Sequence, residues 1–280
     1  MTVAPAPAVT AQAPEHITPR NVDFELDKTR AANWLDGSPE KTLFLNALSI
    51  LFPPGERFFI NAVLSRRDKI TDPKLKAEVK AFVQQEAYHT REHVAYNEAL
   101  NTLVDADKLD RELTEYLDWV KKTLPEGGTL LATCALEHFT AIMAHALLSN
   151  DSDLKGADAD YARMWTWHAL EECEHKAVAF DVYLATMGRK HEFRRIAVMA
   201  LTTITFFKFI GKHCIELMRA QKLAKKPLSW AKLAWFVFGS PGIMRRILPA
   251  YLQYYRPGFH PNDLDDRAEL ARTRELIAAW

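Results

Sequence analysis

The feature that most constrains how this chain folds is a Glu-x-x-His motif that occurs twice, each time with another glutamate well ahead of it. In chain order the residues are Glu56, Glu86, His89, Glu137, Glu172 and His175. The single glutamate precedes its motif by 30 residues in the first half and by 35 in the second, a length that fits two packed helices and a turn. Residues three apart share one face of a helix, so each motif offers a carboxylate and an imidazole to one point. This order predicts a helix bundle that holds two metal ions.

The sequence around Glu137 makes this pattern more specific than one motif would be. A lone Glu-x-x-His is weak evidence, because solvated helix faces are rich in glutamate. The segment LLATCALEHF (130–139), however, contains no Asp, Lys, Arg or second Glu beside Glu137. A carboxylate in so apolar a helix needs a proton, a hydrogen-bond network or a metal. A structural polar network is therefore the alternative to a metal site.

Carboxylates supplemented by imidazoles are the ligands that iron and manganese prefer. In the simplest arrangement Glu86 and Glu172 bridge two ions, and each ion is completed by one glutamate and one histidine. The completing pairs are Glu56 with His89 and Glu137 with His175. Glu171 is a rival to Glu172, because it lies four residues before His175. We prefer Glu172, whose spacing repeats that of the first motif.

Two further histidines share the faces of the motifs. His168 precedes Glu172 by four residues, and His93 follows His89 by four. Either is a candidate additional ligand, although hydrogen bonding behind a ligand is the commoner role for such a histidine.

Helical periodicity dominates from about residue 40 onward, and glycine is scarce at 10 residues. The predicted helices span about 39–52, 56–69, 73–103, 110–123, 129–149 and 157–187, and Pro53-Pro54-Gly55 is expected to break the chain after the first. We expect three regions: a flexible N-terminal arm and lead-in (1–37), a metal-binding four-helix bundle (38–188) and a helical extension that packs on it (189–280).

Composition narrows the partners and the compartment. The chain has 36 basic and 36 acidic residues, and this neutral balance argues against nucleic-acid binding. Three well-separated cysteines and no secretory pattern at the start predict a cytoplasmic protein. The apolar run IAVMALTTITFFKFI (196–210) is shorter than the roughly 20 residues that span a membrane. With its basic and aromatic borders it fits a core or homodimer interface, a hydrophobic substrate tunnel or a peripheral contact with the inner membrane.

Five segments resemble a bacterial family catalogued as predicted metal-dependent hydrolases, and they cover most of residues 40–262. They are PPGERFF (53–59), QQEAYHTREH (84–93), CALEHFTA (134–141), WHALEECEHKAVAFDVY (167–183) and YYRPGFHP (254–261). The resemblance implies an all-α, ferritin-like four-helix bundle with additional C-terminal helices.

More distantly, the ligand order is similar to that of ribonucleotide reductase small subunits and bacterial multicomponent monooxygenases. That similarity implies metal binding by the six motif residues. The final motif is also similar to that of diiron arylamine N-oxygenases, which implies a further ligand at His168. The chain departs from these enzymes at Gln85, where an acidic residue is usual.

These observations favour an O2-activating diiron oxygenase or oxidase that acts on a hydrophobic small molecule. Such an enzyme needs O2 and a separate electron donor, a ferredoxin or reductase, since the chain has no flavin or nicotinamide fingerprint. Two Fe ions are expected, with Mn or mixed Fe/Mn as the next choice and Zn after them. The first alternative is a two-metal hydrolase in which Glu171 or His93 acts as the base. The second is a non-enzymatic metal-binding or membrane-surface module.

Overall fold

The computed structural model describes residues 17–240 and 242–280. Within these ranges the chain forms α-helices, short 3-10 helices and no strand, so the predicted all-α class is confirmed. The α-helices are α1 (Pro39–Leu64), α2 (Pro73–Leu100), α3 (Ala106–Thr123), α4 (Gly128–Leu148), α5 (Ala159–His175), α6 (Val178–Met187), α7 (Glu192–Ala220), α8 (Pro227–Phe238), α9 (Ile243–Gln253) and α10 (Arg267–Ala278). The 3-10 helices are η1 (Lys28–Arg30), η2 (Arg67–Lys69), η3 (Arg189–His191) and η4 (Pro261–Asp263).

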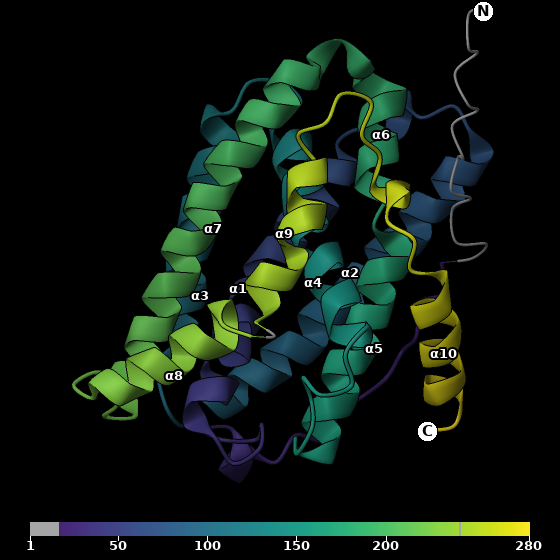
Figure 1. Ribbon diagram of the computed structural model, residues 1–280. Coiled ribbons are helices and arrows are strands. Elements are labelled where there is room, and N and C mark those ends of the chain that lie inside the picture. Colours follow the sequence, from purple (N-terminus) through teal and green to yellow (C-terminus); the bar gives the residue numbers. More distant parts are fainter. Residues whose placement is uncertain (1–16, 241) are drawn as a thin grey trace, which may run out of the picture.

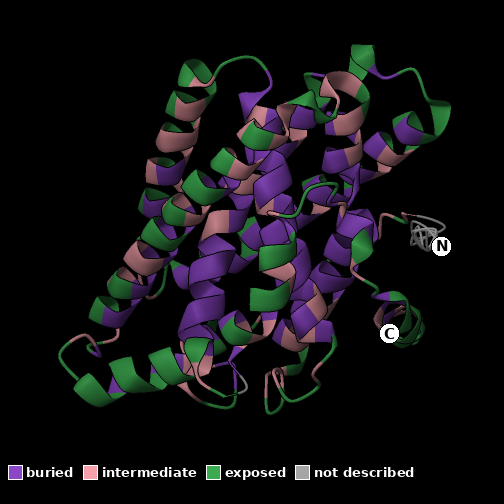
Figure 2. Cartoon of the chain, turned by 45° about the horizontal axis from the view of Figure 1, so that its top comes forward, coloured by how far each residue is buried: buried purple, intermediate pink, exposed green. Residues whose placement is uncertain are grey.

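Four helices, α1, α2, α4 and α5, form the centre of the molecule (Figure 1). Helix α1 contacts α2 and α4, and α5 contacts α4 and α2. Buried residues are concentrated in these helices, whereas exposed residues predominate on the outer ones (Figure 2). Helix α4 has an almost entirely apolar sequence, as expected for a helix that is covered all round. These four helices carry every candidate ligand. A ferritin-like relationship stays a prediction.

The predicted break at Pro53 and Pro54 is wrong, because α1 continues through both prolines. A proline inside a helix leaves the carbonyl four residues earlier without its usual N–H donor. For Pro53 that carbonyl belongs to Ser49, and it accepts a hydrogen bond from Nδ2 of Asn97 at 3.0 Å. A side chain of α2 thus replaces the missing donor, and the continuous helix carries Glu56 into the centre.

The single helix predicted over 157–187 is in fact two helices, α5 and α6, separated by a turn at Lys176 and Ala177. Lys176 is buried, and its Nζ donates hydrogen bonds to Oδ2 of Asp266 at 2.6 Å and to the carbonyl of Leu264 at 2.8 Å. The turn therefore coincides with a contact to a segment some 90 residues away. Local periodicity carries no signal for such a contact.

Helices α7 to α10 cover the central four (Figure 1). Helix α7 contacts α1 and α4, α9 contacts α4, and α10 contacts α5. The apolar run 196–210 lies within α7, where Phe206 is buried and Ile204 is 68% exposed. Among the described residues only α4 is long and apolar enough to cross a membrane, and 83% of its apolar window is buried. Helix α4 is therefore a core helix.

The lead-in before α1 packs against the central helices. Trp34 is fully buried, and its Nε1 donates a hydrogen bond to Oδ1 of Asn46 in α1 at 3.0 Å. The backbone N–H of Phe24 donates to the buried carboxylate of Glu92 in α2. In residues 17–37 the predicted arm is thus held by specific contacts, and its first part (1–16) lies outside the described residues.

Candidate metal centre

Eight of the nine residues proposed from the sequence as ligands or catalytic groups meet at one place between the central helices. They are Glu56 on α1; Glu86, His89 and His93 on α2; Glu137 on α4; and His168, Glu172 and His175 on α5. None is more than 3% exposed. Their ligand atoms form overlapping groups in which all atoms lie within 4.8 Å of one another. The ninth residue, Glu171, lies behind His89 and is described below.

Two of these groups have the membership expected for two ions. They are Glu56, Glu86 and His89, and Glu86, Glu137 and His175. Glu86 belongs to both, as a bridging ligand would. Oε1 of Glu172 lies 3.5 Å from Nδ1 of His89 and 3.6 Å from Nε2 of His175, so Glu172 also contacts both groups. The assignment of individual ligands stays a prediction that this geometry accommodates.

Buried ligand atoms without hydrogen-bond partners mark the centre of the site. Among the described residues, no partner is present for both carboxylate oxygens of Glu56, Glu86 and Glu137, for Oε2 of Glu172, for Nδ1 of His89 or for Nε2 of His175. Burying an unpaired polar atom costs about 1–3 kcal/mol, and more when the group is charged. A set of such atoms turned toward one another fits the binding of cations, which satisfies all of them together.

The electrostatics of the site are dominated by buried carboxylates that crowd one another. Burial raises the pKa of Glu137 well above its usual range, and the nearby carboxylates of Glu86 and Glu172 raise it further. Burial alone would lower the pKa of His89, but the nearby carboxylates of Glu171 and Glu172 raise it to about 10. The carboxylates therefore attract positive charge strongly, whether as protons on the imidazoles or as metal ions.

Outer hydrogen bonds orient the two motif histidines. Nε2 of His89 lies 3.1 Å from Oε2 of Glu171, and Nδ1 of His175 lies 3.1 Å from Oε1 of Gln85. The Gln85 amide is itself fixed, because its Nε2 donates to Oε2 of Glu174 at 3.1 Å. Each histidine therefore donates its outer N–H and leaves the other nitrogen for the centre. Carboxylate and amide partners behind ligand histidines are common in metal sites.

Glu171 is held from behind by the lead-in. The backbone N–H of Arg20 donates to its Oε1 at 2.8 Å, and Nη1 of Arg20 lies 3.2 Å from the same oxygen. Its other oxygen faces His89, so both oxygens are engaged away from the centre. Arg20 also donates to Glu174 through both terminal guanidinium nitrogens, Nη1 and Nη2. This geometry disfavours the rival assignment of Glu171 as a ligand, because its oxygens contact His89 and Arg20.

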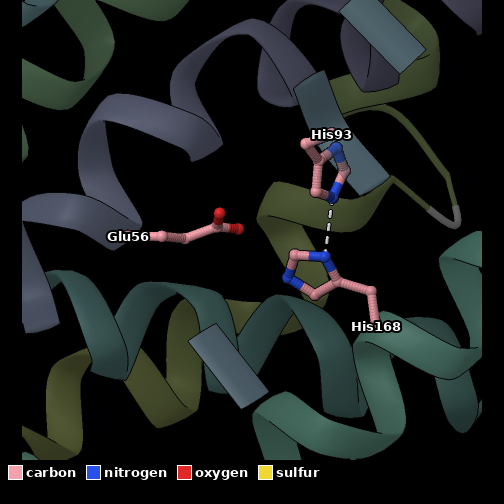
Figure 3. Close-up of side chains that lie close together, drawn as sticks. All are labelled: Glu56, His93 and His168. Carbon is pink, nitrogen blue, oxygen red and sulfur yellow. Dashed lines mark hydrogen bonds between the residues drawn. The ribbon is translucent and has the colours of Figure 1, made fainter. Parts of the chain in front are cut away.

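His93 and His168 form a second polar chain, shown with Glu56 in Figure 3. Oγ of Ser49 donates to Oδ1 of Asn97, so Ser49 can only accept a hydrogen bond from Nδ1 of His93. Nε2 of His93 then accepts a hydrogen bond from the N–H at Nδ1 of His168, at 2.7 Å. This leaves Nε2 of His168 unprotonated, 3.1 Å from Oε1 of Glu172. Two acceptor atoms at that distance need a proton or a metal ion between them, and a metal ion there fits His168 as a ligand.

The residues behind the histidines were not found from the sequence. They are Arg20, Ser49, Gln85, Asn97 and Glu174. In the sequence Gln85 was notable only because the similar enzymes usually have an acidic residue there. In the structure its amide oxygen accepts a hydrogen bond from Nδ1 of His175. The others act across 44 to 154 residues, a separation at which no local pattern signals a contact.

An all-α fold that gathers buried carboxylates and imidazoles around one point defines a candidate metalloprotein. The chain matches the family described as predicted metal-dependent hydrolase over residues 18–265 and belongs to that family. No curated protein and no solved structure matched the chain. Dependence on metal is therefore supported both by the family and by the groups of possible ligands.

The family corrects the main functional expectation. The chain was expected to be an O2-activating diiron oxygenase or oxidase, but its family is described as a hydrolase, in line with our first alternative. The expected partners, O2 and a ferredoxin or reductase, belong to the oxygenase interpretation, and no comparison tests them. The oxygenase expectation rested on the order of the ligands along the chain. The same carboxylates and imidazoles can bind metal ions for hydrolysis or for oxygen chemistry.

Proposed function

We propose that the protein is a hydrolase that uses two divalent metal ions held by α1, α2, α4 and α5. One observation carries the proposal: nine buried ligand atoms have no hydrogen-bond partner among the described residues, and all belong to the six motif residues. Glu56 with His89 would hold one ion and Glu137 with His175 the other, with Glu86 and Glu172 between them. His168 would bind on the side of Glu172. Iron or manganese is proposed ahead of zinc, because carboxylates outnumber imidazoles.

Two ions in such a site lower the pKa of a bound water and polarise an acyl or phosphoryl oxygen. The side of the site that a substrate would meet is that of His168 and Glu172, which line a small cavity of about 40 Å³. Phe52 and Trp165 line the same cavity and would restrict access of bulk water.

Glu172 is the proposed hydrogen-bond acceptor for the attacking water. Burial alone would raise its pKa, but the charge of His175 and the close approach of the neighbouring imidazoles hold the pKa well below its usual range. Glu172 is therefore ionised at neutral pH, and its Oε2 has no hydrogen-bond partner among the described residues. That oxygen can accept a hydrogen bond from a water molecule and orient it.

The geometry favours positioning roles for the two residues first predicted as bases. Glu171 is bonded to His89 and Arg20, and His93 is bonded to His168 and Ser49. Each lies behind a histidine rather than beside the cavity. We propose that both hold an imidazole in the tautomer that a metal requires.

The test is metal-dependent hydrolysis. The protein would be stripped with a chelator, reloaded separately with Fe, Mn or Zn, and assayed on chromogenic carboxylic and phosphoric esters, with metal content measured in parallel. We expect activity that follows metal occupancy, and Glu172→Gln is expected to lower kcat roughly 100-fold or more. Glu98→Gln is the matched control, because Glu98 is exposed on α2. Full occupancy with each ion and no hydrolysis on the whole ester panel would reject the proposal.

We also propose a cytoplasmic location. Cys134, Cys173 and Cys214 are free and buried, as is usual in a reducing compartment. The test is to alkylate the protein's thiols in freshly lysed cells, before and after unfolding, and to count the added groups by mass. We expect all three cysteines to be reduced.

A further inference from the structure

An apolar cavity of about 190 Å³ lies between α1, α3, α4 and α7. None of the residues that line it is charged, and its polar groups are a few hydroxyls. Some of these hydroxyls are already engaged: Oγ1 of Thr140 donates to the carbonyl of Glu137, and Oγ1 of Thr205 bonds the Tyr116 hydroxyl. Typical walls are the side chains of Phe59, Leu117, Leu136 and Phe209. A cavity of this kind binds hydrocarbon.

The inner end of this cavity adjoins the small cavity at the candidate metal centre. Leu48, Phe52, Thr140 and Met143 line both it and the small cavity that His168 and Glu172 line. The Phe52 ring stands at the junction, with its centroid 4.6 Å from that of the His168 ring. The two cavities are thus separated by little more than shared side chains.

The outer end of the cavity opens to solvent between α3 and α7. Trp119 and Leu201 line the cavity and are 57% and 58% exposed, respectively. The residues that line this cavity of about 190 Å³ thus extend from the exposed Trp119 and Leu201 to Phe52 beside the buried metal centre. An apolar cavity of this volume, lined from solvent to the buried site, suits the methylenes of an unbranched chain.

We propose that this passage, Trp119 and Leu201 at its rim and Phe52 at its inner end, binds a linear aliphatic chain. The inference rests on the proposed function in one respect: the chain would be the tail of a substrate whose hydrolysable group lies at His168 and Glu172. Binding of the chain itself requires only the apolar walls. The two claims can therefore fail separately.

The test measures binding without turnover. Saturated fatty acids from six to fourteen carbons, below their critical micelle concentrations, would displace a fluorescent fatty acid from the full-length protein. Burial of a methylene is expected to tighten binding roughly fourfold until the passage is filled. Equal affinity across the series, or equal affinity for branched and linear acids, would overturn the proposal.

Two pairs of variants locate the binding. Leu201→Glu places a charge at the rim and is expected to weaken binding at least tenfold. Ile204→Glu, also exposed on α7 but outside the lining, is its matched control and is expected to bind normally. Ala132→Phe fills the passage from α4, and Ala200→Phe on the exposed side of α7 is the control for added bulk. Loss of binding in both members of a pair, or in neither, would refute the location.

Hydrolysis assays on the same proteins separate this inference from the proposed function. Chain-length-dependent binding with no ester hydrolysis in any metal form would reject the hydrolase and leave the passage standing. Metal-dependent hydrolysis of short esters with no fatty-acid binding would do the reverse. The melting temperature and metal content of each variant would be measured, so that misfolding is not mistaken for a blocked passage.

Discussion

Nε2 of His93 lies 2.7 Å from Nδ1 of His168, so one proton is shared by two buried imidazoles. Burial lowers the pKa of His168 to about 4 and that of His93 well below its usual range, and both rings are therefore neutral at neutral pH. The hydrogen bond from Ser49 to Asn97 decides which ring holds the proton. A contact outside the metal centre thus prepares a nitrogen inside it.

Removing the acceptor behind His168 is expected to weaken metal binding. In His93→Phe, Nδ1 of His168 has no acceptor, and loss of such an outer partner typically costs 10–100-fold in metal affinity. A competition titration against a chromophoric chelator measures the change. His93→Gln restores an acceptor and should recover part of the affinity. His138→Phe is the control. It also removes a buried imidazole, but Nε2 of His138 bonds the carbonyl of Ala250 and not a candidate ligand. Unchanged affinity in His93→Phe would contradict the relay.

Replacing one buried carboxylate should affect stability and metal binding in opposite directions. Glu137 is 1% exposed, and neither of its oxygens has a hydrogen-bond partner among the described residues. In the presence of a chelator, Glu137→Leu is expected to stabilise the fold by about 1–3 kcal/mol, since it removes a buried carboxyl group whose oxygens have no hydrogen bond and only a 3.4 Å contact with Nε2 of His175. The same variant should lose metal. Urea unfolding in the presence of a chelator measures the stability, and elemental analysis measures the metal content. If the variant is less stable than the parent protein in chelator, the Glu137 carboxylate is not an unsatisfied group.

Metal binding should release protons and tighten as pH rises. His89, whose pKa is raised to about 10, carries a proton at neutral pH and must lose it before Nδ1 can bind a metal. Glu56 and Glu137, whose pKa values burial raises, release protons in the same direction. The affinity is therefore expected to fall as the pH is lowered from 8 to 5. Calorimetric titration in two buffers of different ionisation enthalpy counts the protons, and equal heats in both would refute the prediction.

Arg20 should stabilise the fold from outside the helices. Its guanidinium lies 3.2 Å from Glu171 and 2.8 Å from Glu174, whose carboxylates are fully buried. Arg20→Met is expected to lower the free energy of unfolding by about 2–3 kcal/mol, less than for a fully buried pair, because Arg20 is 18% exposed and Glu174 keeps Arg274. Arg30→Met, at an exposed site, is the control. Urea midpoints compare the two, and equal midpoints would show that the lead-in adds nothing.

The candidate ligands could be predicted from the sequence because helical spacing is a local property. Glu86 and His89 share a face wherever that helix lies, and so do Glu172 and His175. Their meeting required only that the helices pack by their apolar sides. The helical breaks were harder to predict. Pro53 does not end α1, because a side chain 44 residues further along, that of Asn97, supplies the missing donor.

The sequence by itself therefore determined the all-α class and the residue types and faces of the candidate site. Only the tertiary structure decided which group lies behind each histidine, why Glu171 turns away from the centre and that an apolar cavity lies beside the small one that Glu172 lines. The physical reason is range. Helix formation and side-chain phase depend on neighbours three or four residues away. Tautomers, satisfied carbonyls and cavities depend on atoms brought together from distant parts of the chain.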